Sequence, residues 1–433
     1  SRFGETFMTV RGLEFWGQHV NLVAYLYAPF YWLGAGPAFL YVSQAIVLGL
    51  GALPVYLIAR DRFDRPWVGL TFAVCFLLYA PIQWISWANY HPEALVITPF
   101  LFAWWFAMHK RWGWFFVFIG LALATREDTA MAVFMLGIVL LVINWRGSRL
   151  DKRMAIGTMA LGVIWYLITT QLMIPWANDG RQPFYLEYFY GSYGGSIPEI
   201  AGNILRHPDR VVRDGIEPDR IQFYRDLLLP WGGLPLLAPL ELLMALPQLL
   251  ASVIGASPYA RMIKYQYTAV MIAPIVIAAI EGAHKVWRFK IVRRLLIPYL
   301  LIWAYVTNVA WSPSPIGNEY SVWVTSNARQ ESLDHAVSLV PDDASVTATY
   351  GLLPHMAHRD QIYDWPNPFQ AAYWGNNDTY RLPDPSTIEY LVIDRQQVGE
   401  AQRQLLADLI DGDPYEIVFD QQDVVVAHRV APG

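Results

Sequence analysis

This chain contains a series of apolar stretches, each long enough or nearly long enough to cross a lipid bilayer as a helix. A spanning helix needs roughly 20 mostly apolar residues. Only 15% of the residues are charged, whereas soluble domains carry about 25%. The pattern predicts an all-α polytopic transmembrane bundle of about ten spans. The expected spans cover residues 38–59, 67–85, 93–109, 112–125, 129–145, 154–175, 222–237, 239–255, 266–283 and 294–311.

The charged residues between these stretches orient the chain. Lysine and arginine are concentrated in four connections, and the positive-inside rule places such connections in the cytoplasm. The connections over residues 86–92, 126–128, 176–221 and 256–265 then lie on the outer side, together with the N-terminus. The basic connections contain Arg60, Arg62, Arg65, Lys110, Arg111, Arg146, Arg149, Lys152, Arg153, Lys285, Arg288, Lys290, Arg293 and Arg294.

Two further segments are expected at the membrane surface. Residues 19–34 are apolar but short and contain a proline, so we expect a helix that lies on the membrane or dips into it. Residues 176–221 form a long external loop that is first rich in Tyr, Gly and Pro and then helical and polar. Aromatic residues concentrate at membrane interfaces, which favours an ordered loop.

The C-terminal part of the chain has a different composition. Residues 318–433 hold 18 of the 36 acidic residues but only 6 of the 31 Lys and Arg residues. We therefore divide the chain near Gly317 into a transmembrane domain (1–317) and an acidic, extracytoplasmic α/β domain (318–433). Alternating patterns predict that small α/β fold. We expect helices over 328–340, 351–358 and 400–411, and strands over 345–349, 361–365, 388–394, 415–419 and 423–429.

Several kinds of site are absent from the sequence. Cys75 is the only cysteine, so no disulfide or cysteine metal site can form within the chain. Neither a G-x-G-x-x-G motif nor a P-loop marks a nucleotide site, and nothing indicates a nucleic-acid partner. No spacing predicts a metal site, so no cofactor is required, although the acids would allow a divalent metal. Residues 377–379 form a glycosylation sequon.

Ionisable groups at membrane depth are costly and are functional candidates by default. One candidate group is the Asn89–Glu93 turn, in which His91 and Glu93 could line a substrate site. The structural alternative is that Glu93 favours the dipole of the helix that it opens.

A second candidate group is formed by Arg126, Glu127 and Asp128, between two apolar stretches. A carboxylate could act as a base beside a guanidinium that binds a phosphate. Alternatively, Asp128 caps the next helix and Arg126 pairs with an acid.

A third candidate group is the segment from Tyr259 to Tyr267. Arg261, Lys264, Tyr265 and Tyr267 could hold a phosphate or a sugar. They could equally form an interfacial belt with snorkelling cations. His19 is a further candidate, since it is expected on the same side of the membrane.

In combination, these motifs resemble the bacterial membrane proteins grouped as domain of unknown function 2079. The resemblance covers nearly the whole chain. Members usually begin with one more spanning helix and an external stretch containing an Asp. Here only Glu5 and Glu14 remain as acids of that stretch, and we therefore expect a fragment. The matching motifs are HVNLVAYLYAPFYWL (19–33), QAIVLGLGALPVYLIAR (44–60), HPEAL (91–95), REDTA (126–130), APLELL (238–243), KYQYTA (264–269) and the tail from VPDDASVTAT to YLVID.

The family is similar, more distantly, to the GT-C membrane glycosyltransferases. This resemblance implies a bacterial cytoplasmic-membrane protein that transfers a sugar from a polyprenyl-phosphate donor to an envelope acceptor at the outer face. Glu127 or Asp128 would then be the base or orient the acceptor, and His91 and Glu93 would line its site. The lipid phosphate would be held by Arg126, Arg261 and Lys264.

Two other classes of function remain open from the sequence. A lipid or solute transporter would use the proline-rich region 230–247 and Glu241 at its centre, as broken helices near the bilayer midplane do in transporters. A non-catalytic scaffold would use the acidic domain to recruit an external partner, and its charged groups would not meet in one place.

Overall fold

The structure, a computed structural model, describes residues 6–178, 180, 185–319, 327–372, 381–412 and 414–430. These residues belong to two compact units. The helical unit comprises His19–Tyr27 and Phe39–Trp323, and the sheet unit comprises Ser1–Gln18, Ala28–Ala38 and Val324–Gly433. Residues 1–18 and 28–38, which we expected within the transmembrane domain, thus group with the sheet unit. The domain limits near Gly317 stay a prediction.

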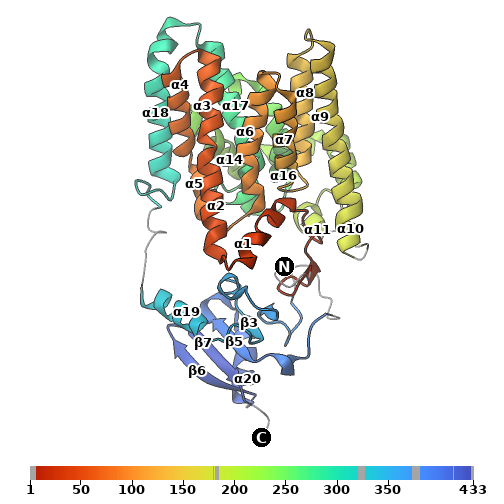
Figure 1. The fold of residues 1–433 in the computed structure, drawn as a ribbon, viewed down its shortest axis with the longest axis vertical. Coiled ribbons are helices and arrows are strands. Elements are labelled where there is room, and N and C mark those ends of the chain that lie inside the picture. The colour runs from red at the N-terminus through yellow and green to blue at the C-terminus, as the bar shows by residue number, and fades with distance from the viewer. Residues whose placement is uncertain are drawn as a thin grey trace. The chain divides into compact units, whose positions relative to one another are not determined.

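The helices of the helical unit run side by side around α17 (Figure 1), whose residues from Ala269 to Ala283 are all buried. The start of α9 illustrates how the sequence sets a helix boundary. The Ser148 hydroxyl accepts from the Asp151 backbone N–H, and the Asp151 carboxylate accepts from that of Ser148, which is a capping box. The main helices are α2 (Pro37–Leu50), α3 (Ala52–Phe63), α4 (Pro66–Leu77), α5 (Ala80–Trp87), α6 (Ile97–Met108), α7 (Trp112–Leu123), α8 (Thr129–Ile143), α9 (Arg149–Ile168), α14 (Pro218–Leu228), α16 (Leu246–Ile254), α17 (Ala269–Val286) and α18 (Lys290–Trp311).

Helix length and apolar character support fewer spans than the ten we expected. Among the described residues, Pro37–Phe63, Arg149–Ala177 and Gln266–Val286 are long and apolar enough to cross a membrane. Helices α4 and α5 would be a fourth span if taken together, but they meet at a bend of 49°. Pro81 lies in the first turn of α5, where a proline cannot continue the hydrogen bonds of a preceding helix. Four further apolar helices of the described residues are shorter, so a count of about ten stays a prediction; they are Pro92–Met108, Trp112–Leu123, Thr129–Ile143 and Pro239–Ile254.

The expected spans over 222–237 and 239–255 are interrupted in the structure. Between α14 and α16 the chain forms short turns: η4 (Leu229–Trp231), η5 (Leu234–Leu237), α15 (Pro239–Leu242) and η6 (Leu243–Ala245). This segment packs directly on the backbone of α17. A Cβ added at Gly282 would lie 2.0 Å from the carbonyl oxygen of Leu234, so only glycine permits this approach.

The long loop contains three short helices: α11 (Tyr185–Tyr190), α12 (Ile197–Arg206) and α13 (Pro208–Gly215). The polar second half predicted the last two, whereas α11 lies in the aromatic first half, where no helix was expected. A small apolar cluster around the buried Tyr193 joins this loop to Val253 and Ile254 of α16. The described part of the loop is therefore packed on the helical unit.

The sheet unit contains a five-stranded sheet in the order β4-β3-β5-β7-β6. Strand β3 is parallel to both β4 and β5, and β7 is antiparallel to β5 and β6. The predicted strands and the helices near 328–340 and 400–411 are confirmed, whereas residues 351–358 form only a short 3₁₀ turn, η10 (Leu353–Met356). The elements are α19 (Ala328–Ser338), β3 (Val346–Ala348), β4 (Ile362–Asp364), β5 (Tyr390–Asp394), α20 (Glu400–Asp411), β6 (Tyr415–Gln421) and β7 (Val424–Arg429).

An N-terminal hairpin, β1 (Phe7–Met8) with β2 (Leu13–Glu14), is part of the sheet unit. The Thr9 hydroxyl donates to the carbonyl of Ile362 in β4, and Arg381 pairs with Glu14 at 2.7 Å. The single interfacial helix expected over 19–34 is not formed. Instead, η1 (Leu22–Leu26) lies in the helical unit and α1 (Ala28–Trp32) in the sheet unit.

Candidate functional site

Ionisable side chains from three separate segments of the helical unit meet in one place. Arg126, in the connection between α7 and α8, donates from Nη1 to Oε1 of Glu93 at 2.8 Å and from Nη2 to Oδ2 of Asp128 at 2.5 Å. Glu93 lies in η2 (Pro92–Val96), directly before α6. We call this group the Arg126 cluster; its members are His19, His91, Glu93, Arg126, Glu127 and Asp128.

Glu127 has different partners from Asp128 and binds the start of the helical unit. Its Oε1 lies 2.7 Å from Nδ1 of His19, and its Oε2 accepts from the backbone N–H of Val20 at 3.0 Å. The Glu127 side chain is 4% exposed and that of His19 is 27% exposed. The acid is therefore enclosed, whereas the imidazole reaches the surface of the cluster.

His91 is a partly exposed member of this cluster, with 28% of its side chain exposed. Its Nδ1 lies 3.9 Å from Oε1 of Glu93. Gln44 of α2, which is fully buried, fixes the backbone here: its Oε1 accepts from the N–H of His91 at 2.8 Å, and its Nε2 donates to the carbonyl of Ile85 at 2.8 Å. Sequence reasoning missed Gln44, although an amide inside an expected span was a usable signal.

Burial and neighbouring charges set the protonation of the two carboxyls beside Arg126. Burial raises the pKa of Asp128, and the nearby Glu127 and Glu93 add to this effect against the attraction of Arg126. Burial alone would also raise the pKa of Glu127, but His19 and Arg126 outweigh it and hold this pKa below its ordinary value. The pKa values of these two adjacent acids are therefore shifted in opposite directions.

Two polar atoms of the cluster are buried without a hydrogen-bond partner among the described residues: Nε of Arg126 and Oδ1 of Asp128. Such atoms are uncommon in folded proteins. They leave one donor and one acceptor that a bound polar molecule could satisfy.

Tyrosines of the long loop border the cluster. The ring of Tyr185 stacks on His19, with centroids 5.1 Å apart and planes at 19°. Burial raises the pKa of Tyr190 to about 12, while the charge of Arg126 opposes this shift. Tyr267, which lies outside the loop, packs its ring near that of Phe189 in the loop, with the ring centroids 6.0 Å apart. Tyr185 was not singled out from the sequence, because only the fold brings residue 185 to residue 19.

The other predicted binding residues make contacts of their own. Arg261 donates to Asp219 and to the carbonyls of Ser252 and Gly255, and its side chain is 6% exposed. This guanidinium is thus occupied in holding the loop to the end of α16.

Lys264 is more accessible. Its Nζ lies 3.3 Å from Glu319 and 4.5 Å from the centroid of the Trp84 ring, and its side chain is 46% exposed. Tyr265 packs its ring edge-on to Tyr259, 5.1 Å between centroids. The described contacts of Arg261, Lys264 and Tyr265 do not include a member of the Arg126 cluster.

A separate pair of buried acids lies towards the other end of α17. Glu281 pairs with Arg62 of α3 at 2.8 Å. Glu241 of α15 is 3.9 Å from Lys285, and its Oε2 is buried without a hydrogen-bond partner among the described residues. About 14 residues of helix, roughly 21 Å, separate Tyr267 from Glu281.

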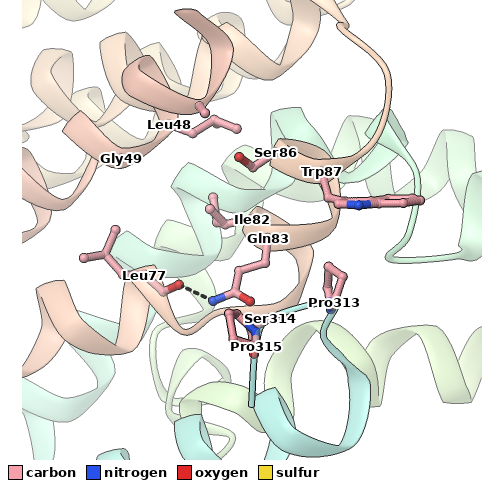
Figure 2. A pocket seen from close by; sticks show the side chains of 11 residues that line it. Leu48, Gly49, Leu77, Ile82, Gln83, Ser86, Trp87, Pro313, Ser314 and Pro315 are labelled. Carbon is pink, nitrogen blue, oxygen red and sulfur yellow. Dashed lines mark hydrogen bonds between the residues drawn. The ribbon is translucent and has the colours of Figure 1, made fainter. Parts of the chain in front are cut away.

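An apolar pocket of about 280 Å³ lies between α2, α5 and residues 313–315 (Figure 2). Figure 2 shows the amide of Gln83 donating to the Leu77 carbonyl, and Trp87 at the edge of the pocket. No ionisable side chain lines it, so this pocket suits an apolar group and not acid–base chemistry.

No group of three or more His, Cys, Asp or Glu residues in the described parts of the chain is arranged to hold a metal ion. The Arg126 cluster has the residue types for proton transfer and for hydrogen bonding to a polar ligand. Glu5 and the sequon at 377–379 lie outside the described residues.

No curated protein matches the chain. The model of a family described as "Predicted membrane protein (DUF2079)" matches residues 3–426, and these include every residue of the Arg126 cluster. The chain therefore belongs to the DUF2079 family of predicted membrane proteins.

Proposed function

We propose that this chain is a GT-C-like membrane glycosyltransferase that takes a sugar from a polyprenyl-phosphate donor and passes it to a hydroxyl of an envelope acceptor. The observation that carries the proposal is the convergence of His19, Glu93 and the Arg126–Asp128 segment in one buried cluster. A scaffold would not need this convergence.

The charge of the cluster suits the acceptor side of the reaction. Three carboxyl groups surround the single guanidinium of Arg126. Acidic groups bind and activate hydroxyls, and negative charge stabilises the oxocarbenium-like centre that develops when a glycosidic bond breaks. Glu93 and His91 would hold the acceptor, as the sequence analysis expected.

The donor phosphate needs a cation with an N–H group that is available to donate to it. Arg126 already binds Glu93 and Asp128, so it would have to release one carboxylate to bind a phosphate. Lys264 is about half exposed and is the more accessible cation, whereas Arg261 is enclosed. Developing negative charge on the leaving phosphate would be stabilised by such a cation.

The location belongs to the same proposal. The basic residues beside α3, α9 and α18 favour the cytoplasm for those helix ends under the positive-inside rule. The opposite ends, with the Arg126 cluster, would then face outwards in the bacterial cytoplasmic membrane, as would the sheet unit.

A transporter is the second candidate function, and one observation favours it. Glu241 is 6% exposed, lies in the broken segment between α14 and α16, and has an oxygen without a hydrogen-bond partner among the described residues. Buried acids on broken helices bind protons or ions in transporters. This candidate predicts that Glu241→Gln abolishes function while changes in the Arg126 cluster are tolerated.

The test is mass spectrometry of the lipids that co-purify with the gently solubilised protein. We expect a polyprenyl-phosphate sugar with the unmodified protein and with Arg288→Ala, which removes an exposed arginine outside the cluster. Arg126→Ala and Lys264→Ala should lose it. Bulk phospholipid alone in every sample would count against the transferase and direct attention to transport assays.

A further inference from the structure

Glu127 and His19 form a hydrogen-bonded pair, and the two groups differ in which atoms remain available to a substrate. Both oxygens of Glu127 are occupied, one by Nδ1 of His19 and the other by the N–H of Val20. With its side chain only 4% exposed, this acid has no free face from which to take a proton from a substrate. Its geometry is that of a group that holds an imidazole in place.

The hydrogen bond to Glu127 also selects the tautomer of His19. An ionised carboxylate accepts only, so Nδ1 must carry the hydrogen of this 2.7 Å contact. The lone pair is then on Nε2, which has no hydrogen-bond partner among the described residues. The stacked ring of Tyr185 fixes the plane in which Nε2 points.

From this geometry we infer that His19 is the general base of the cluster and that Glu127 is its positioning residue, an inference that rests on the proposed transferase function. A carboxylate that orients an imidazole and stabilises its protonated form is a recurrent catalytic arrangement. Here it replaces the expectation that Glu127 or Asp128 is the base.

Nε2 of His19 removes the proton of the acceptor hydroxyl while that oxygen forms a bond to the anomeric carbon of the donor sugar. The bond from that carbon to the phosphate oxygen breaks, and polyprenyl phosphate leaves with the electron pair. The proton stays on His19, where the charge of Glu127 stabilises it.

Asp128 is the competing base, because its Oδ1 has no hydrogen-bond partner among the described residues. Its other oxygen is bound to Arg126 at 2.5 Å. A proton transferred to Asp128 would weaken that ion pair, whereas a proton on His19 strengthens its contact with Glu127. The two assignments differ in how the rate depends on pH.

The first experiment measures sugar transfer by the full-length protein as a function of pH. The unmodified protein should show a fall in rate at acidic pH, as the base becomes protonated. In Glu127→Gln this fall should move to lower pH, because a neutral amide stabilises the protonated ring less. His19→Gln should lower the rate by about 10²- to 10⁴-fold and lose the acidic fall, and a fall lost only in Asp128→Asn would overturn the inference.

The second experiment does not depend on transfer. Diethyl pyrocarbonate acylates unprotonated imidazole, and peptide mass spectrometry of the detergent-solubilised protein reports the modification of each histidine. His19 should react, and its reactivity should persist to lower pH in Glu127→Gln, whereas His207→Gln, which changes an exposed histidine of the long loop, should leave it unchanged. An unreactive His19, or an identical pH dependence in Glu127→Gln, overturns the inference. A wild-type protein that transfers no sugar overturns the proposed function instead.

Discussion

The Nη1 of Arg126 lies 2.8 Å from Oε1 of Glu93, and this ion pair joins the residues that precede α6 to the connection between α7 and α8. The two side chains are 14% and 8% exposed. Taking such charges out of water is costly, so the pair matters most when one partner is removed. It holds together a region in which His19 and Asp128 must keep their places.

We expect Arg126→Ala to destabilise the helical unit by about 3–5 kcal/mol, because it leaves Glu93 and Asp128 buried without their cation. Thermal unfolding of the purified protein in mild detergent measures this effect. Glu93→Gln combined with Arg126→Ala should recover part of the loss, since one uncompensated charge is removed. Arg288→Ala is the control. If Arg126→Ala destabilised the protein as little as Arg288→Ala does, the prediction would be contradicted.

Gln44→Leu should destabilise the protein by about 1–3 kcal/mol, because the N–H of His91 and the carbonyl of Ile85 both lose a buried partner. Thermal unfolding again measures the change. Gln83→Leu is the matched control: Gln83 makes one hydrogen bond, and its oxygen is already buried without a partner among the described residues. If the Gln83 variant loses as much stability as the Gln44 variant, hydrogen bonding of Gln44 does not fix this turn.

Local patterns in the sequence were enough to predict most of the helices and strands. The periodicity of residues 400–411 and the short apolar runs around β5 and β7 were enough to place those elements. Charges within apolar surroundings also pointed to Arg126, Glu127 and Asp128. In each case the signal lies in neighbouring residues.

What the sequence could not show are contacts between distant segments. The pairing of His19 with Glu127 joins residues 108 positions apart, and no local pattern reports it. The prolines of residues 230–247 did indicate a break between α14 and α16, but they could not show what this segment packs against. Gly282 of α17 has no side chain and so leaves room for the Leu234 carbonyl.

Gly282→Ala should therefore be strongly destabilising, because the new Cβ would lie 2.0 Å from the Leu234 oxygen and backbone must move. Displacing packed segments typically costs about 1–3 kcal/mol or more. The control is Gly157→Ala in α9, where no atom lies within 4 Å of the added Cβ. That change should be neutral or stabilise by up to about 1 kcal/mol through helix propensity. Equal melting temperatures for the two variants would contradict the close packing of η5 on α17.

Asp364 is the last residue of β4 in the sheet unit. Burial raises the pKa of this carboxyl to about 6, against the opposing charge of Arg11. Between about pH 4 and 6 the folded form therefore holds a proton that the unfolded form, with its ordinary pKa of about 3.9, has already released.

Because the folded state binds more protons in this range, its stability falls as the pH rises through 6 and is greatest near pH 4 and below for this group. Hydrogen exchange of the β3 and β4 amides in the full chain, corrected for the intrinsic pH dependence, should show less protection at pH 7 than at pH 5. Asp364→Asn should remove the difference. Asp384→Asn should keep it, because hydrogen bonds from Ser386 lower the pKa of Asp384, so Asp384 stays ionised in both states across this range. Protection that rises with pH would mean that Asp364 is better solvated than its packing in β4 indicates.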